Sequence, residues 1–197
     1  MAMYLPNVIE YPIIFHGAAN LGGVVTTLNP QCTREELCRF LKISRANFLV
    51  TSPDLAQKAF NSGVLEKVCS VFLNGQSENF ESVSSLLADD GTAFPKDVKI
   101  NPREDVVTLL FSSGTTGASK GVMLTHYNLI AQCRIIYGDF NPLEDTGTVI
   151  NVLPLFHVYG LSVICWSRLH AGRKIVLLRR FDPKVFLQAI QDYKVSF

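Results

Sequence analysis

The sequence has no excess of either charge and no long apolar run. Its 18 lysines and arginines nearly balance its 17 aspartates and glutamates, which gives a formal net charge of +1. This balance provides no electrostatic reason to expect nucleic acid or an anionic membrane surface as a partner. No apolar stretch reaches about 18 residues without a polar break, so we expect no transmembrane helix. The first residues lack a basic segment followed by a long apolar one, and they predict no signal peptide.

Cysteines are few, odd in number and scattered along the chain. They form no C-x-x-C pair, and none has a histidine at a spacing typical of metal ligands. Such a set is typical of a reducing compartment, where thiols serve as small core residues. We therefore expect neither a disulfide framework nor a structural metal site among the five cysteines, which are Cys32, Cys38, Cys69, Cys133 and Cys165.

The composition is that of a globular protein. Hydrophobic residues make up 48% of the 197 positions and charged residues 18%. These values lie far from those of disordered chains. The length is sufficient for one large domain with its own core, or for part of a larger unit. No internal repeat or low-complexity tract is present.

Apolar patterns of strand and helix type alternate along the chain. Thr33 and Glu36 have the spacing of a capping box and predict the start of one helix, and Asp182 before Pro183 predicts another. The alternation predicts an α/β fold, with a mainly parallel sheet flanked by helices. The expected strands are 3–5, 24–28, 47–51, 68–73, 106–111, 148–153 and 174–178, and the other expected helices are 8–21, 53–61, 81–87, 127–137 and 157–169.

Two segments carry neither pattern in full. Residues 88–105 are polar and contain proline, so we expect a surface connection there. Residues 194–197 are typical of the start of a further strand. A parallel strand without its neighbour exposes apolar surface and unpaired backbone groups. We therefore expect this chain to be part of a longer protein.

The most informative segment runs from Thr108 to His126. An apolar strand changes abruptly to a run of glycine, serine and threonine that leads to Lys120. Glycines permit backbone conformations closed to other residues, so several N–H groups can point at one anion, and the hydroxyls and the lysine add further donors. The order G-x-x-G-x-x-K-G differs from the Walker A loop, because Ser119 precedes the lysine and Gly121 follows it. The segment predicts a phosphate-binding loop, with an ordinary turn between strands as the alternative.

A second informative segment runs from Leu153 to Gly160. It contains Pro154, His157 and Tyr159 between an expected strand and an expected helix. Ligands of open α/β sheets bind at the carboxyl ends of the strands, which makes these side chains candidates for a site. A histidine with a purely structural role is the alternative for His157, because an acid–base role depends first on geometry. Tyr159 can line a pocket or fill the core.

Together the two segments resemble the signature motifs of the adenylate-forming enzymes. Ser-Ser-Gly-Thr-Thr-Gly before Lys120 resembles the phosphate loop of this family, and Pro-Leu-Phe-His157 resembles its next motif. Its members include acyl-CoA and aryl-CoA synthetases, beetle-luciferase-like enzymes and peptide-synthetase adenylation domains. The resemblance is closest to the 4-coumarate–CoA ligase-like and luciferase-like members. It implies that residues 1–197 are a partial N-terminal AMP-binding domain without the C-terminal domain, and it extends to residues 5–7, 23–27 and 29–30.

The resemblance implies an acid–thiol ligase. In this family a carboxylate attacks the α-phosphorus of ATP, giving an acyl-adenylate and pyrophosphate, and the acyl group then moves to a thiol, usually that of coenzyme A. The expected ligands are therefore ATP, Mg²⁺, coenzyme A and a small carboxylic acid, and the ligand residue for Mg²⁺ is expected outside this chain. The resemblance further implies an intracellular protein, cytoplasmic or peroxisomal. A luciferase-like monooxygenase relative is an alternative activity.

The resemblance also implies roles for individual residues. Lys120 and His157 are the implied catalytic residues. His157 and Tyr159 are expected to border the acyl group, and Arg180 to contact the nucleotide end of coenzyme A, although a charged strand end facing water explains Arg180 almost as well. Ser119 stands where many relatives have proline. The residues implied to hold the phosphates are Ser112, Ser113, Gly114, Thr115, Thr116, Gly117 and Lys120.

Two further functions stay open from the sequence. The segments that contact adenine, ribose and magnesium in this family have no counterpart in residues 1–197, so the chain could be a catalytically inactive binding or regulatory module. A P-loop phosphotransferase is a weaker interpretation, because the Walker A order is not met. ATP hydrolysis to ADP, rather than to AMP and pyrophosphate, would favour it.

Overall fold

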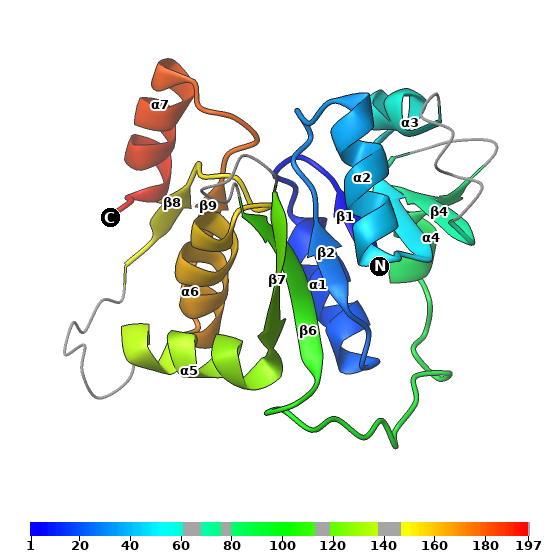
Figure 1. The fold of residues 1–197 in the computed structure, drawn as a ribbon. Coiled ribbons are helices and arrows are strands. Elements are labelled where there is room, and N and C mark those ends of the chain that lie inside the picture. Colours follow the sequence, from blue (N-terminus) through cyan, green and yellow to red (C-terminus); the bar gives the residue numbers. More distant parts are fainter. Residues whose placement is uncertain (61–67, 76–79, 113–118, 138–146, 197) are drawn as a thin grey trace.

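A computed structural model gives the fold and describes residues 1–60, 68–75, 80–112, 119–137 and 147–196 (Figure 1). Its strands are β1 (Ala2–Tyr4), β2 (Val25–Thr27), β3 (Phe48–Thr51), β4 (Ser70–Leu73), β5 (Glu81–Ser82), β6 (Val106–Ser112), β7 (Lys120–Thr125), β8 (Val149–Asn151) and β9 (Ile175–Leu177). Its helices are α1 (Glu10–Asn20), α2 (Arg34–Ser44), α3 (Pro53–Phe60), α4 (Val83–Leu87), α5 (His126–Tyr137), η2 (Tyr159–Trp166), α6 (Ser167–His170) and α7 (Pro183–Tyr193).

Within these residues the strands form two sheets. The larger has seven strands in the order β5-β4-β3-β1-β2-β6-β7, and the smaller pairs β8 with β9. All neighbours are parallel except β6 and β7, which are antiparallel. The predicted α/β fold with a mainly parallel sheet is confirmed.

Helices cover both faces of the large sheet, because successive side chains of a strand point to opposite faces. Met3 of β1 packs in a core with Tyr11 and Phe15 of α1. Its neighbour Tyr4 packs in the opposite core with Leu37 of α2. In Figure 1, α1 accordingly lies behind the sheet and α2 in front of it. Among the described residues, none of the helices combines enough length with enough apolar character to cross a membrane.

Two predicted helix starts are confirmed in detail. The hydroxyl of Thr33 accepts a hydrogen bond from the backbone N–H of Glu36 (3.2 Å), whose carboxylate accepts one from the N–H of Thr33 (2.7 Å). This reciprocal capping box satisfies two donors that the first turn of α2 leaves free. Asp182 caps α7 differently, because its carboxylate accepts from the backbone N–H groups of both Lys184 and Val185.

Two elements differ from the sequence-based expectation. Residues 81–87 form the short strand β5 before α4 rather than a helix alone. The expected helix 157–169 begins at Tyr159 as a π-helix and becomes α-helical only at Ser167. An apolar pattern at the α-helical period gives no sign of this change. Val195 pairs in parallel with Thr148, which agrees with the expected start of a strand in residues 194–197.

Candidate functional site

Both informative segments line one hollow of about 520 Å³ at the carboxyl ends of β2 and β6. Ser112, at the end of β6, Ser119, directly before β7, and His157 all line it. The carboxyl edge of an open α/β sheet is the usual position of a ligand site. The other residues that line this hollow are Thr27, Leu28, Asn29, Cys32, Glu36, Phe40, Leu110, Phe111, Val122, Leu124, Phe156 and Val158.

The segment around His157 is fixed by a buried asparagine far away in the sequence. The side-chain N–H₂ of Asn7 donates to the carbonyl oxygens of Leu153 and Leu178, both at 3.0 Å. Its oxygen accepts from the N–H of Leu155 at 2.8 Å. One side chain thus joins the carboxyl end of β1 to the segments that follow β8 and β9. No role in the site was predicted for Asn7 from the sequence.

A second link comes from β2. The hydroxyl of Thr27 donates to the carbonyl oxygen of Phe156 at 2.7 Å. Thr27 is buried, so its hydroxyl needs a partner inside the protein, and Phe156 supplies it. The hydrogen bond places the backbone directly before His157 at the end of the large sheet.

The first turn of η2 requires a glycine at position 160. Asn151 is fully buried; its side-chain N–H₂ donates to the carbonyl of Gly160 (3.1 Å), and its oxygen accepts from the N–H of Leu153 (3.1 Å). A Cβ atom at Gly160 would lie only 2.4 Å from the carbonyl oxygen of Pro154. No side chain fits at that distance, so the tight turn depends on this glycine.

His157 is exposed, and one ring nitrogen is already occupied. Its Nδ1 accepts a hydrogen bond from the backbone N–H of Tyr159 at 3.2 Å. In the neutral ring the proton therefore lies on Nε2, which is the nitrogen left to donate to a ligand. Tyr159 itself is exposed and does not line the hollow.

The two strands beside the predicted phosphate loop are paired. Ser112 is opposite Lys120 in the β6–β7 ladder, so Lys120 begins the returning strand. Lys120 is exposed, and it does not line the hollow although Ser119 before it does. The other predicted phosphate ligands, Ser113, Gly114, Thr115, Thr116 and Gly117, lie outside the described residues.

Arg180 lies apart from these residues. It is exposed in the segment between β9 and α7 and does not line the hollow. Its neighbour Arg179 forms an exposed ion pair with Asp54 of α3, at 3.0 Å. The geometry therefore brings Ser112 and His157 together and leaves Tyr159, Lys120 and Arg180 outside the lining of this hollow.

Cys32, which lines the hollow, and the nearby Tyr4 are uncharged. Burial raises the pKa of the Cys32 thiol, and burial together with the nearby Cys32 raises the pKa of Tyr4. Both groups therefore stay neutral at physiological pH. The hydroxyl of Tyr4 donates to the carbonyl of Pro30 at 3.1 Å, and Lys58 donates to the carbonyl of Cys32. These contacts hold the turn after β2 against α3.

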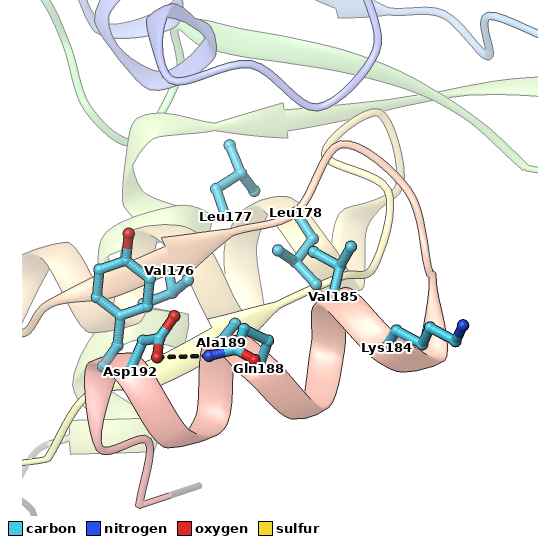
Figure 2. A pocket seen from close by; sticks show the side chains of 9 residues that line it. Val176, Leu177, Leu178, Lys184, Val185, Gln188, Ala189 and Asp192 are labelled. Atoms are coloured by element: carbon cyan, nitrogen blue, oxygen red, sulfur yellow. Dashed lines mark hydrogen bonds between the residues drawn. The ribbon is translucent and has the colours of Figure 1, made fainter.

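Two other hollows contain none of the predicted site residues. Figure 2 shows one of about 480 Å³, lined by aliphatic side chains of β9 and α7 and by Asp192, which accepts from Gln188. The other, of about 370 Å³, lies between α1, α5 and α6. In the part of the chain that the structure describes, no group of three or more histidine, cysteine, aspartate or glutamate side chains could hold a metal ion.

Comparison with known proteins decides the family. The family model described as "AMP-binding enzyme" matches residues 1–197. The chain belongs to the AMP-binding enzyme family. One relative is 4-coumarate–CoA ligase 5 of Oryza sativa subsp. japonica, which is 38% identical over 197 residues, an alignment that covers 98% of this chain and 36% of the relative. The resemblance to the adenylate-forming enzymes is thereby confirmed.

Solved structures of AMP-binding enzymes share the fold. A long-chain-fatty-acid-CoA ligase from Archaeoglobus fulgidus is 30% identical with a TM-score of 0.84, over 100% of this chain and 38% of that chain. ATP-bound MatB from Rhodopseudomonas palustris is 26% identical with a TM-score of 0.78, over 98% of this chain and 37% of that chain. The chain therefore spans little more than a third of the length of these relatives.

Proposed function

We propose that this AMP-binding chain forms the phosphate-binding part of the N-terminal domain of an acid–CoA ligase. The proposed reaction joins a carboxylic acid to ATP, releases pyrophosphate, and then transfers the acyl group to coenzyme A. The observation that supports it most is the single hollow at which Ser112, Ser119 and His157 meet at the carboxyl edge of the sheet. The CoA ligases and the ATP-bound structure among its relatives support the same reaction class.

The donors around this hollow suit a polyphosphate. Hydroxyl groups at Ser112 and Ser119, and the exposed ammonium group of Lys120, provide neutral and charged donors without a buried positive charge. When the acid attacks the α-phosphorus, negative charge moves onto the departing pyrophosphate. Donors fixed at the far phosphates stabilise that charge and hold ATP in line for the attack. We assign this role to Ser112, Ser113, Gly114, Thr115, Thr116, Gly117 and Lys120.

His157 also lines the hollow. Because Nδ1 is held by the backbone of Tyr159, Nε2 can donate to an oxygen of the acyl group or its adenylate. We propose that Tyr159 borders the acyl group and that Arg180 binds a phosphate of coenzyme A from outside the hollow. Mg²⁺ would supply a further charge at the phosphates, with its ligand outside the described residues. ATP and coenzyme A as substrates imply an intracellular protein, cytoplasmic or peroxisomal.

Pyrophosphate release tests the proposal. The chain, and a longer form if its gene continues in frame, would be incubated with ATP, Mg²⁺, coenzyme A and a panel of aromatic, medium-chain and long-chain acids. Acid-dependent formation of AMP and pyrophosphate supports an acid–CoA ligase. ATP binding by calorimetry without turnover identifies a binding module instead, and release of ADP identifies a phosphotransferase.

A further inference from the structure

Helix α2 contacts the strands on both sides of the predicted phosphate loop. The guanidinium of Arg39 donates from Nη2 to the carbonyl oxygen of Ser119 at 3.1 Å, directly before β7. In the next position, the ring of Phe40 packs on Phe111 of β6, with centroids 4.3 Å apart and ring planes at 34°. Two consecutive residues of one helix thus hold the strand that enters the loop and the strand that leaves it.

The helix itself is firmly placed. Its capping box fixes the first turn, and Leu37, Phe40 and Leu41 are buried in the core that includes Ala2 and Tyr4 of β1. Arg39 is exposed and extends from this fixed support to the loop. A charged donor to a carbonyl is among the stronger hydrogen bonds, so the contact holds the Ser119 carbonyl more firmly than a neutral donor would.

We propose that Arg39 is a positioning residue for the phosphate loop. In a trans peptide the C=O and the following N–H point in opposite directions. When Arg39 holds the carbonyl of Ser119 toward α2, it therefore turns the N–H of Lys120 away from α2 and fixes the start of the strand that carries the lysine. Phe40 packs on Phe111 and thereby sets the position of β6, which ends at Ser112. This inference rests on the proposed function, because the ligand of the loop is the triphosphate of ATP.

The test compares Arg39→Met with Lys42→Met. Both changes remove one positive charge from an exposed position of α2 and leave an unbranched side chain, but among the described residues only Arg39 donates a hydrogen bond to Ser119. Calorimetry would measure the dissociation constant for ATP, and hydrogen exchange would follow the amides of Lys120 and Gly121 without nucleotide. We expect Arg39→Met to weaken ATP binding about 3- to 10-fold, the usual contribution of one ordinary hydrogen bond, because this contact is exposed to solvent.

Further readouts separate positioning from a general loss of structure. Arg39→Met should speed exchange at Lys120 and Gly121, raise KM for ATP more than it lowers kcat, and leave the urea midpoint within the range of Lys42→Met. Arg39→Lys, which can still donate to the Ser119 carbonyl, should recover part of the ATP affinity. If Arg39→Met matches Lys42→Met in ATP affinity and in exchange, Arg39 has no positioning role.

Failure of the proposed function gives a different result. If ATP does not bind and Lys120→Ala changes nothing, the nucleotide site itself is wrong, while exchange at Lys120 and Gly121 still reports whether Arg39 holds the strand. If Lys120→Ala weakens ATP binding but Arg39→Met does not, and exchange is unchanged, the nucleotide site stands and the role of Arg39 is overturned.

Discussion

The side chain of Asn7 donates to the carbonyl oxygen of Leu178 at 3.0 Å, across 171 positions of sequence. The same side chain also donates to the carbonyl oxygen of Leu153 and accepts from the N–H of Leu155. Asn7, which follows the first strand, therefore connects the large sheet to the two-stranded sheet at the edge where the candidate site lies. The position of His157 depends on this link, because residues 153–155 immediately precede it.

Replacing Asn7 with alanine should destabilise the protein. The change leaves a buried carbonyl, a buried N–H and a partly buried carbonyl without their partner. Each buried group of this kind costs about 1–3 kcal/mol, so we expect a loss of about 3 kcal/mol in the free energy of unfolding. Urea denaturation followed by circular dichroism measures it. Asn47→Ala, at an exposed asparagine, is the matched control and should change stability by less than about 0.5 kcal/mol. Equal effects of the two changes would show that the Asn7 contacts contribute little.

Lys120→Ala should slow acid-dependent pyrophosphate release without unfolding the protein. Removing one charged donor from developing negative charge lowers kcat by about 10²- to 10³-fold in other enzymes, and we expect a similar loss. Lys120 is exposed, so the urea midpoint should stay unchanged. Lys99→Ala, at another exposed lysine in the connection before β6, should retain full turnover. Full turnover in Lys120→Ala would remove this lysine from the mechanism.

Gly160→Ala should disrupt the first turn of η2. The new Cβ would lie 2.4 Å from the carbonyl oxygen of Pro154, so the backbone on one side must move. We expect a loss of stability of about 2 kcal/mol or more, together with displacement of His157. Gly17→Ala is the control, since no atom lies within 4 Å of its new Cβ and alanine favours a helix interior, so thermal unfolding should show a neutral or stabilising effect. A neutral Gly160→Ala would mean that the turn adapts.

Stability should fall at alkaline pH, in part through Cys165. Burial raises the pKa of this thiol from 9.0 to about 11. The folded state keeps the thiol proton more strongly than the unfolded state, so the stabilisation is complete below pH 9 and is lost as pH rises toward about 11. Urea unfolding at pH 7, 9 and 10 measures the slope. Cys165→Ala should reduce that slope, whereas Cys69→Ala, at an exposed cysteine, should not. An identical slope in both variants would refute the assignment.

The parts of the fold that local sequence patterns determine could be predicted. The capping box at Thr33 and the cap at Asp182 depend on residues within one helical turn, and both were confirmed. The strand before the phosphate loop shows as an apolar run of β-rich residues, and it too was correct. Neither the antiparallel return of β7 nor the π-helix at Tyr159 could be predicted, because tertiary contacts decide them and the apolar period does not.

The candidate site divides in the same way. Motif order predicted that Ser112 and His157 serve one site, and the hollow contains both. No role in the site was predicted for Asn7 or Arg39. Both donate to backbone carbonyls far along the chain, and because every residue has a carbonyl, no sequence pattern identifies these partners. Two weak signals were present. Asn7 follows a proline at the end of a strand, and Arg39 lies on a helix that packs beside the loop. The roles assigned to Ser112, His157, Lys120, Tyr159 and Arg180 all stay predictions.

The strand order has a consequence for synthesis on the ribosome. Among the described strands, the first to be made, β1, lies inside the large sheet between β2 and β3. Each later strand of that sheet then adds at an open border: β2 and β3 on either side, β4 and β5 beyond β3, and β6 and β7 beyond β2. Among the described strands, no two that have already paired must separate for a later strand to be inserted between them. The nascent chain can therefore assemble this sheet outward from β1 in the order of translation.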